Sequence, residues 1–89
     1  MNLEFDKSFE KSLDKIKDKK LLRRIELALL KAEESESIEA IPNTRKLSGF
    51  SDYFRIKLGD YRLGFERIND KTIRFIILAH RKDIYKRFP

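Results

Sequence analysis

The residues of this chain best placed to do chemistry are three cations in the stretch 53–65, namely Arg55, Lys57 and Arg62. Side chains alternate along a β-strand, so a tight turn in the middle of the stretch places all three on one face, with Lys57 opposite Arg62. Like charges directly opposite each other destabilise a sheet. Such a face is either screened by water or offered to an anion, and the spacing alone leaves both interpretations open. Gly64, opposite Arg55, leaves room in the middle of this face for a ligand to lie flat.

The hairpin that positions these cations is predicted from its alternating pattern and from a two-residue turn at Gly59-Asp60. The face of the hairpin opposite the cations is apolar. A further strand over residues 72–79 is expected after a turn at 69–71. The cross-strand pairs expected within the hairpin, beside those above, are Leu58–Tyr61, Ile56–Leu63, Phe54–Phe65 and Tyr53–Glu66. Those expected with the last strand are Phe65–Phe75, Leu63–Ile77 and Glu66–Arg74.

The N-terminal half is predicted to be mostly helical. Residues 2–5 indicate a short strand, and Asp6 is suited to cap a helix. Two apolar stripes at helical spacing follow, separated by a break at residues 17–20, and residues 38–45 are expected to form a loop. The members of the stripes are Phe9, Leu13 and Ile16 in the first and Leu21, Ile25, Ala28, Leu29 and Ala32 in the second.

This order predicts one α+β domain over residues 1–89. A short N-terminal strand and a two-helix hairpin precede a three-stranded antiparallel meander. Because two helices can cover one face of the sheet, the cationic face is expected to be open.

The composition favours an acidic partner. The chain has 89 residues and a formal net charge of +6, with 40% charged residues and no cysteine. A disulfide framework and a cysteine-ligated metal are therefore excluded. The sequence has no apolar run long enough to span a bilayer and no apolar signal segment, so a cytoplasmic protein without membrane contact is expected. Nucleic acid, an anionic surface or an acidic protein would each suit the positive charge.

Residues 46–85, KLSGFSDYFRIKLGDYRLGFERINDKTIRFIILAHRKDIY, resemble the C-terminal half of the RelE/ParE superfamily of toxins. The family pattern is K-L-x-G, then a strand Y-[RK]-[IV]-[RK]-x-G-x-[YW]-R-[LV]-x-[YF], then a strand ending G/A-H-R-x-x-[VI]-Y. Residues 46–49, 54–65 and 79–85 correspond to these three parts. The resemblance implies a RelE-like, microbial ribonuclease-type fold and a toxin of a type II toxin–antitoxin pair.

The ribonuclease members of this superfamily enter the ribosomal A site and cleave mRNA there. The resemblance therefore implies an endoribonuclease, or mRNA interferase, that inhibits translation without a metal or other cofactor. The 2′-hydroxyl attacks the adjacent phosphate and leaves a 2′,3′-cyclic phosphate. This reaction needs a base, a cation on the phosphorane and an acid at the leaving oxygen.

The resemblance implies five catalytic residues: Arg55, Lys57, Arg62, Arg81 and Tyr85. Lys57 is expected to be the base or to assist it, because crowded like charges disfavour an ammonium. Arg62 can hold the phosphate with its planar fork, and Arg81 is expected to stabilise or protonate the leaving group. Tyr85 could stack on a base or orient the 2′-hydroxyl. Arg55 stands where some members have lysine, which leaves the identity of the general base open.

The register of the last strand decides on which face of the sheet two residues near its end lie. His80, the only histidine, shares the cationic face with Arg62 by alternation, where it could shuttle a proton. The other interpretation of His80 is a structural residue at a strand end, hydrogen-bonded to backbone. Arg81 falls on the apolar face by alternation, so the strand must end or bulge near Ala79 if Arg81 is to join the site. Four further cations are predicted to bind RNA, namely Arg45, Lys46, Lys82 and Lys86.

The expected partners are a cognate acidic antitoxin, the ribosome and mRNA, with DNA reached only through the antitoxin. Two other functions stay open. ParE-type members share the fold but poison DNA gyrase, and they usually lack the full cationic set. A non-catalytic basic RNA-binding module is the third interpretation, although Tyr53 is the only clear aromatic residue on the cationic face.

Overall fold

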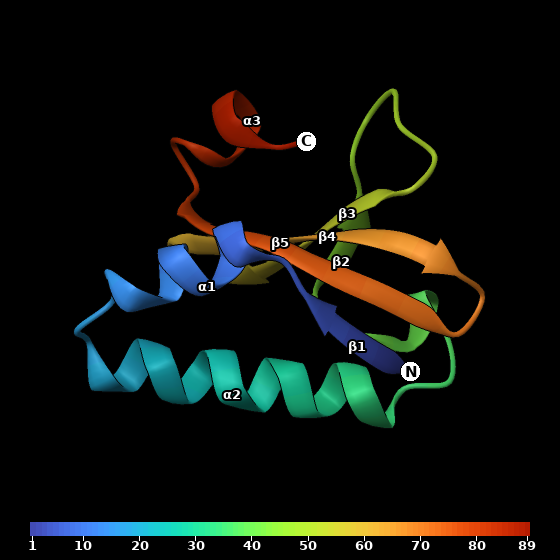
Figure 1. The fold of residues 1–89 in the computed structure, drawn as a ribbon, viewed down its shortest axis with the longest axis horizontal. Coiled ribbons are helices and arrows are strands. Elements are labelled where there is room, and N and C mark those ends of the chain that lie inside the picture. Colours follow the sequence, from blue (N-terminus) through green and yellow to red (C-terminus); the bar gives the residue numbers. More distant parts are fainter.

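The computed structural model describes residues 1–89 and is built around one five-stranded sheet with the order β1-β5-β4-β3-β2 (Figure 1). β1 runs parallel to β5, and the other neighbouring strands are antiparallel. The strands are β1 (Asn2–Phe5), β2 (Thr44–Lys46), β3 (Tyr53–Leu58), β4 (Tyr61–Asn69) and β5 (Thr72–His80). The helices are α1 (Lys7–Asp14), α2 (Lys19–Glu34), the 3₁₀ turn η1 (Ile38–Ala40) and α3 (Ile84–Arg87).

The predicted α+β class, the first strand, the two helices and the β3–β4–β5 meander are confirmed. The expected loop over residues 38–45 was wrong in part, because it contains η1 and the start of β2. β2 is an edge strand of three residues, too short to show an alternating apolar pattern.

The two main helices begin where an aspartate can accept hydrogen bonds from the first turn. The Asp6 carboxylate accepts from the backbone N–H and the hydroxyl of Ser8, and these bonds lower the pKa of Asp6. The Asp18 carboxylate accepts from the N–H groups of Lys20 (2.9 Å) and Leu21 (3.3 Å). Each aspartate satisfies backbone donors that an α-helix leaves unpaired at its start.

The main core lies between the helices and one face of the sheet. Phe9 of α1 and Ile25 of α2 pack on the buried apolar residues of the hairpin and β5. The rings of Phe54, Phe65 and Phe75 form a row across three strands, with centroids 5.3 and 5.5 Å apart. Figure 1 shows α2 and α3 on opposite sides of the sheet.

A β-bulge in β5 changes the predicted register. Phe65 pairs with Phe75 as expected, but Gly64 pairs with Ile77 and Leu63 with Leu78, so Ile76 is the extra residue. The predicted Leu63–Ile77 pair was therefore wrong. Residues 75–79 are apolar on both faces of the strand, so alternation could not fix this register.

Two serines of α1 satisfy backbone groups at the bulge. The Ser8 hydroxyl shares its single proton between the Asp6 carboxylate and the carbonyl of Ile76, and the buried Ser12 hydroxyl accepts from the N–H of Leu78 (3.0 Å). Because buried backbone groups need partners, these contacts anchor the bulge to the first helix.

The second face of the sheet is not fully open, contrary to expectation. The C-terminal segment folds back on it, and a second apolar cluster forms from Leu47, Ile77, Ala79, Ile84 and Phe88. The Phe88 ring lies directly over Gly64, with ring atoms 2.9 Å from where a Cβ would stand. The room left by this glycine is therefore occupied by the chain itself.

Candidate functional site

Four cations line one cavity of about 620 Å³ on the second face of the sheet, beside the β3–β4 turn. We call it the cationic cavity and define it by Arg45, Arg55, Lys57 and Arg62, with segment 39–44 as its wall. The predicted hairpin register is confirmed, since Lys57 pairs with Arg62 and Arg55 with Gly64. Arg45 of β2 pairs with Arg55, which extends the row of cations to the edge of the sheet.

Backbone carbonyls, rather than carboxylates, hold two of the three arginines of the cationic cavity, Arg55 and Arg62. Arg55 Nη1 donates to the carbonyl of Asn43 (3.1 Å), which also accepts from the N–H of Lys57 (3.0 Å). Arg62 Nη1 donates to the carbonyls of Gly59 (2.7 Å) and Tyr61 (2.9 Å). The side chains are thus oriented without losing their net charge.

None of the three ion pairs in the structure involves a cation of the cationic cavity. They join Arg74 to Glu4 and Glu66, and Arg81 to Asp60. Four like charges thus line one cavity together with Glu39, which makes no ion pair. This arrangement favours an anion that carries charge on several oxygens, such as a phosphodiester.

Arg81 lies next to the cationic cavity, at the β3–β4 turn. Its N–H donates to the carbonyl of Asp60 (2.7 Å), and its Nε is 3.8 Å from the Asp60 carboxylate. The bulge that the parity of Arg81 required is present, although it lies at Ile76 rather than near Ala79. Because of the bulge, Ala79 pairs with Arg62 and lies on the cationic face. Alternation from Ala79 then places Arg81 on this face as well.

His80 was wrongly predicted to share the cationic face. The same bulge pairs it with Tyr61 on the helix side of the sheet, where the two rings meet edge to face at 5.5 Å. Its Nδ1 accepts from the N–H of Lys82 (3.2 Å). These contacts fit the alternative role, a structural histidine at a strand end.

Tyr85 lies away from the cationic cavity. It is 62% exposed and lines a second space of about 440 Å³, which we call the aromatic hollow. The hollow lies between the loop 47–52 and the C-terminal segment, and its lining residues are Leu47, Ser48, Phe50, Tyr85, Lys86, Phe88 and Pro89. The predicted catalytic residues therefore divide into two neighbouring groups.

The four predicted RNA-binding cations are likewise dispersed. Arg45 lines the cationic cavity and Lys86 lines the aromatic hollow. Lys46 pairs with Phe54 and so falls on the helix side at the sheet edge, whereas Lys82 is exposed in the turn after β5.

Three residues of this region were not among the predicted site residues. Asn43 has a φ of 62°, in the left-handed region, and this conformation aims its carbonyl at Arg55 and Lys57. Phe50 and Phe88 each contact the ring of Tyr53 edge to face, with centroids 5.7 and 5.6 Å apart. The carboxylate of Glu66, opposite Tyr53, raises the pKa of that tyrosine. The Pro42-Asn43 pair signalled a turn, but no local pattern marked either phenylalanine.

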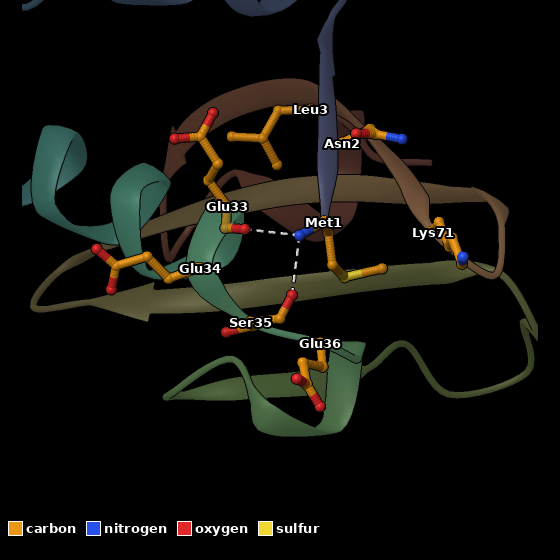
Figure 2. A pocket seen from close by; sticks show the side chains of 8 residues that line it. All are labelled: Met1, Asn2, Leu3, Glu33, Glu34, Ser35, Glu36 and Lys71. Atoms are coloured by element: carbon orange, nitrogen blue, oxygen red, sulfur yellow. Dashed lines mark hydrogen bonds between the residues drawn. The ribbon is translucent and has the colours of Figure 1, made fainter.

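Another hollow lies elsewhere and has a different character. It measures about 850 Å³ and is lined by Glu33, Glu34, Glu36 and the first residues of β1 (Figure 2). The Met1 amino group donates there to the carbonyls of Glu33 and Ser35 (Figure 2). Its three glutamates outnumber its two cations, Lys71 and the Met1 amino group, so it suits an anionic ligand less well than the cationic cavity and is not the candidate site.

The structure contains no group of three or more His, Cys, Asp or Glu side chains placed to hold a metal ion. None of its helices combines the length and the apolar character needed to cross a bilayer.

Comparison with known proteins gives consistent matches over nearly the whole chain. The model of a family described as the ParE toxin of type II toxin–antitoxin systems matches residues 3–85. Toxin RelE3 of Methanocaldococcus jannaschii is 36% identical over 90 residues, with all of both chains covered.

Two solved complexes contain a similar chain. The RelB–RelE antitoxin–toxin complex from Methanococcus jannaschii matches with 35% identity and a TM-score of 0.78, over 97% of this chain and 99% of that one. The archaeal RelE–RelB complex from Pyrococcus horikoshii OT3 matches with 28% identity and a TM-score of 0.67, over 93% and 97%.

Proposed function

Because this chain belongs to the RelE/ParE superfamily of type II toxins, we propose that it is a ribosome-dependent endoribonuclease that cleaves mRNA in the A site. The observation that carries this proposal is the cationic cavity, where Arg45, Arg55, Lys57 and Arg62 gather without a carboxylate partner. Such a cavity can bind the phosphodiester and stabilise the extra negative charge of the pentavalent transition state.

In the proposed reaction, the 2′-oxygen attacks the adjacent phosphorus and the bond to the 5′-oxygen breaks. Lys57, once it has lost its own proton to water, accepts the 2′-hydroxyl proton, because an arginine side chain in the cavity cannot be deprotonated. Arg55 and Arg62 hold the phosphate oxygens with guanidinium groups that backbone carbonyls already orient. Arg81, beside the turn, stabilises the negative charge on the leaving 5′-oxygen, which takes its proton from water. No metal or cofactor takes part in these steps.

We propose an acidic antitoxin as the protein partner. The two solved relatives above are toxins in complex with RelB, and the present chain carries a net charge of +6. Electrostatic steering would make the association fast and sensitive to salt.

The test is cleavage of mRNA on ribosomes with a vacant A site, read by mapping the new RNA ends. We expect cuts confined to A-site codons and a 2′,3′-cyclic phosphate on the upstream fragment. Lys57→Ala should lower the rate about 10²–10⁴-fold, the usual contribution of a general base. Lys11→Ala is the matched control, since it removes the same charge from an exposed position on α1. Equal rates for the two variants would contradict the assignment of Lys57.

Inhibition of DNA gyrase is the second candidate, because the matching family model is that of the ParE toxin. The two functions differ in their first effect after induction of the chain in cells. A ribonuclease stops protein synthesis at once, whereas a gyrase poison causes DNA damage while translation continues. DNA damage with intact mRNA would favour the gyrase function.

A further inference from the structure

Glu39 is the only carboxylate side chain among the residues that line the cationic cavity. Four cations line the same space, yet none of the three ion pairs of the structure involves Glu39. The residue also lines a smaller space of about 230 Å³ with Arg67, again without an ion pair. A negative charge weakens the binding of a phosphodiester, and the reaction steps proposed above do not use this one.

The fold holds the backbone of Glu39 in a defined place on the wall of the cavity. Ile38 before it and Ile41 after it are 5% and 4% exposed and belong to the main core, whereas Glu39 itself is exposed. The N–H of Ile41 donates to the carbonyl of Ile38 (3.0 Å), and the N–H of Ala40 donates to the carbonyl of Ser37 (3.2 Å). The carboxylate is therefore carried by a hydrogen-bonded 3₁₀ turn that two buried side chains anchor.

Glu39 also supplies a function that the cations of the cavity lack. Lysine and arginine side chains only donate hydrogen bonds, so they can bind phosphate oxygens but cannot accept from the N–H groups of a nucleobase. The carbonyl of Asn43, on the same wall, already accepts from Arg55 and Lys57. The Glu39 carboxylate is thus the charged acceptor in a cavity whose other charged groups are donors.

Guanine is the RNA base that suits a carboxylate best. Its Watson–Crick edge carries two neighbouring donors, N1–H and N2–H, and the two oxygens of one carboxylate can accept from both. Adenine and cytosine each offer one amino group beside an acceptor nitrogen, and uracil offers one N–H between two carbonyl oxygens. Those acceptor atoms would face the carboxylate and repel it. Unpaired bases in a single strand expose this edge to a protein.

We propose that Glu39 recognises a guanine of the RNA strand bound in the cationic cavity, by accepting hydrogen bonds from its N1–H and N2–H. Arg55 and Arg62 hold a phosphate of the same strand. The cavity volume of about 620 Å³ lies in the range of sites that hold small organic ligands, so a phosphate and a base fit together. Glu39 is then a specificity-determining residue. The inference rests on the proposed function for the presence of RNA in the cavity.

The experiment measures binding of fluorescent 2′-O-methyl RNA hexamers, which cannot be cleaved, by anisotropy at low salt. Each hexamer consists of uridines, and one central position carries guanosine, inosine or uridine. Inosine keeps the N1–H of guanosine but lacks its 2-amino group. We expect the wild-type chain to bind the guanosine hexamer about tenfold more tightly than the inosine hexamer, the lower end of the range for a hydrogen bond to a charged group. The uridine hexamer should bind most weakly.

Glu39→Gln changes the affinities of two hexamers in opposite directions. Its amide has one acceptor oxygen and one donor nitrogen, so it cannot accept from both guanine donors, and guanosine and inosine should bind alike. The uridine hexamer should bind about two- to fivefold more tightly, because one negative charge has left the cavity. Glu26→Gln is the matched control, since it removes the same charge from an exposed position on α2 and should keep the discrimination between hexamers. Circular dichroism checks that each variant is folded.

The outcomes distinguish this inference from the proposed function. Equal binding of guanosine and inosine hexamers to the wild-type chain would overturn the recognition of guanine and leave the phosphate site intact. If Glu39→Gln kept the discrimination but slowed cleavage of all A-site codons alike, Glu39 would be a proton acceptor and the inference would be wrong. Discrimination that depends on Glu39, without any cleavage on ribosomes, would support the inference and overturn the proposed function. No binding of any hexamer would overturn both.

Discussion

The contact between Gly64 and Phe88 predicts that a single methyl group will destabilise the protein. In Gly64→Ala, the new Cβ would stand 2.9 Å from two atoms of the Phe88 ring and 3.1 Å from a third. Ordinary contacts between carbon atoms are about 3.5–4.0 Å, so the ring must retreat by roughly 0.6–1 Å. Phe88 is only 3% exposed and is packed in the second apolar cluster, so it cannot retreat freely.

The expected magnitudes follow from this geometry. Overpacking in a core costs about 1–3 kcal/mol, while replacing a glycine within a strand gains about 0.5–1 kcal/mol. Gly64→Ala should therefore lower the free energy of unfolding by about 1 kcal/mol, and by at most about 2.5 kcal/mol. Phe88→Ala alone should lower it by about 3–5 kcal/mol. With the ring absent, the same Gly64→Ala change should become neutral or stabilising.

The assay is urea unfolding followed by circular dichroism, applied to both single variants and the double variant. If Phe88→Ala leaves too little stability to measure, Phe88→Leu removes the ring and keeps part of the buried surface. Gly49→Ala is the control, because its φ of 84° strains any other residue while no atom lies within 4 Å of the new Cβ. Its cost should be the same with and without Phe88. If the cost of Gly64→Ala also proved independent of Phe88, the reasoning would be refuted.

Four further predictions concern the site and the elements that hold it. Arg62→Ala should reduce cleavage about 10²–10³-fold with only a small loss of stability. A variant whose lost cleavage is explained by unfolding would instead make Arg62 a structural residue. Deleting residues 83–89 should destabilise the fold, as thermal unfolding will show, because it uncovers the second apolar cluster. Ser12→Ala should lower the free energy of unfolding by about 1–3 kcal/mol, since the buried N–H of Leu78 loses its acceptor; an unchanged urea midpoint would contradict this. Asp6→Ala should lower the melting temperature at neutral pH. Because the folded state lowers the pKa of Asp6, this difference should vanish as the pH falls through that value, and a constant difference would argue against the cap.

The hairpin was predictable because its sequence alternates strictly between apolar and polar residues around a Gly-Asp turn. One face of β3 is buried in the core and the other is cationic, so a shift by one residue would exchange them. The relative positions of Arg55, Lys57 and Arg62 followed from this alternation alone.

The parts of the site in β5 and in the C-terminal segment could not be predicted, because their sequences do not alternate between apolar and polar residues. The run FIILA in β5 is apolar at every position, so both registers would bury apolar side chains, and the distant Ser8 and Ser12 favour the bulge. Phe88 follows six residues of which four are charged, and it resembles an exposed tail residue until its partner Gly64 is known. The deletion of residues 81–89 is therefore expected to destabilise the fold, because it removes Ile84 and Phe88 from the second apolar cluster.

The pairing of β1 with β5 determines when the molecule can be completed. Asn2 pairs with Thr72 and Phe5 with Phe75, so the first strand has no hydrogen-bonding partner in the sheet until residues 72–75 have been synthesised. Contacts between such distant segments form late and slow folding, because a long loop must close first. The bulge, Arg81 and the aromatic hollow depend on β5 and on the segment after it, whereas β2, β3 and β4 are consecutive. The chain therefore acquires the full surface of its candidate site only after β5 and the segment that follows it have been synthesised.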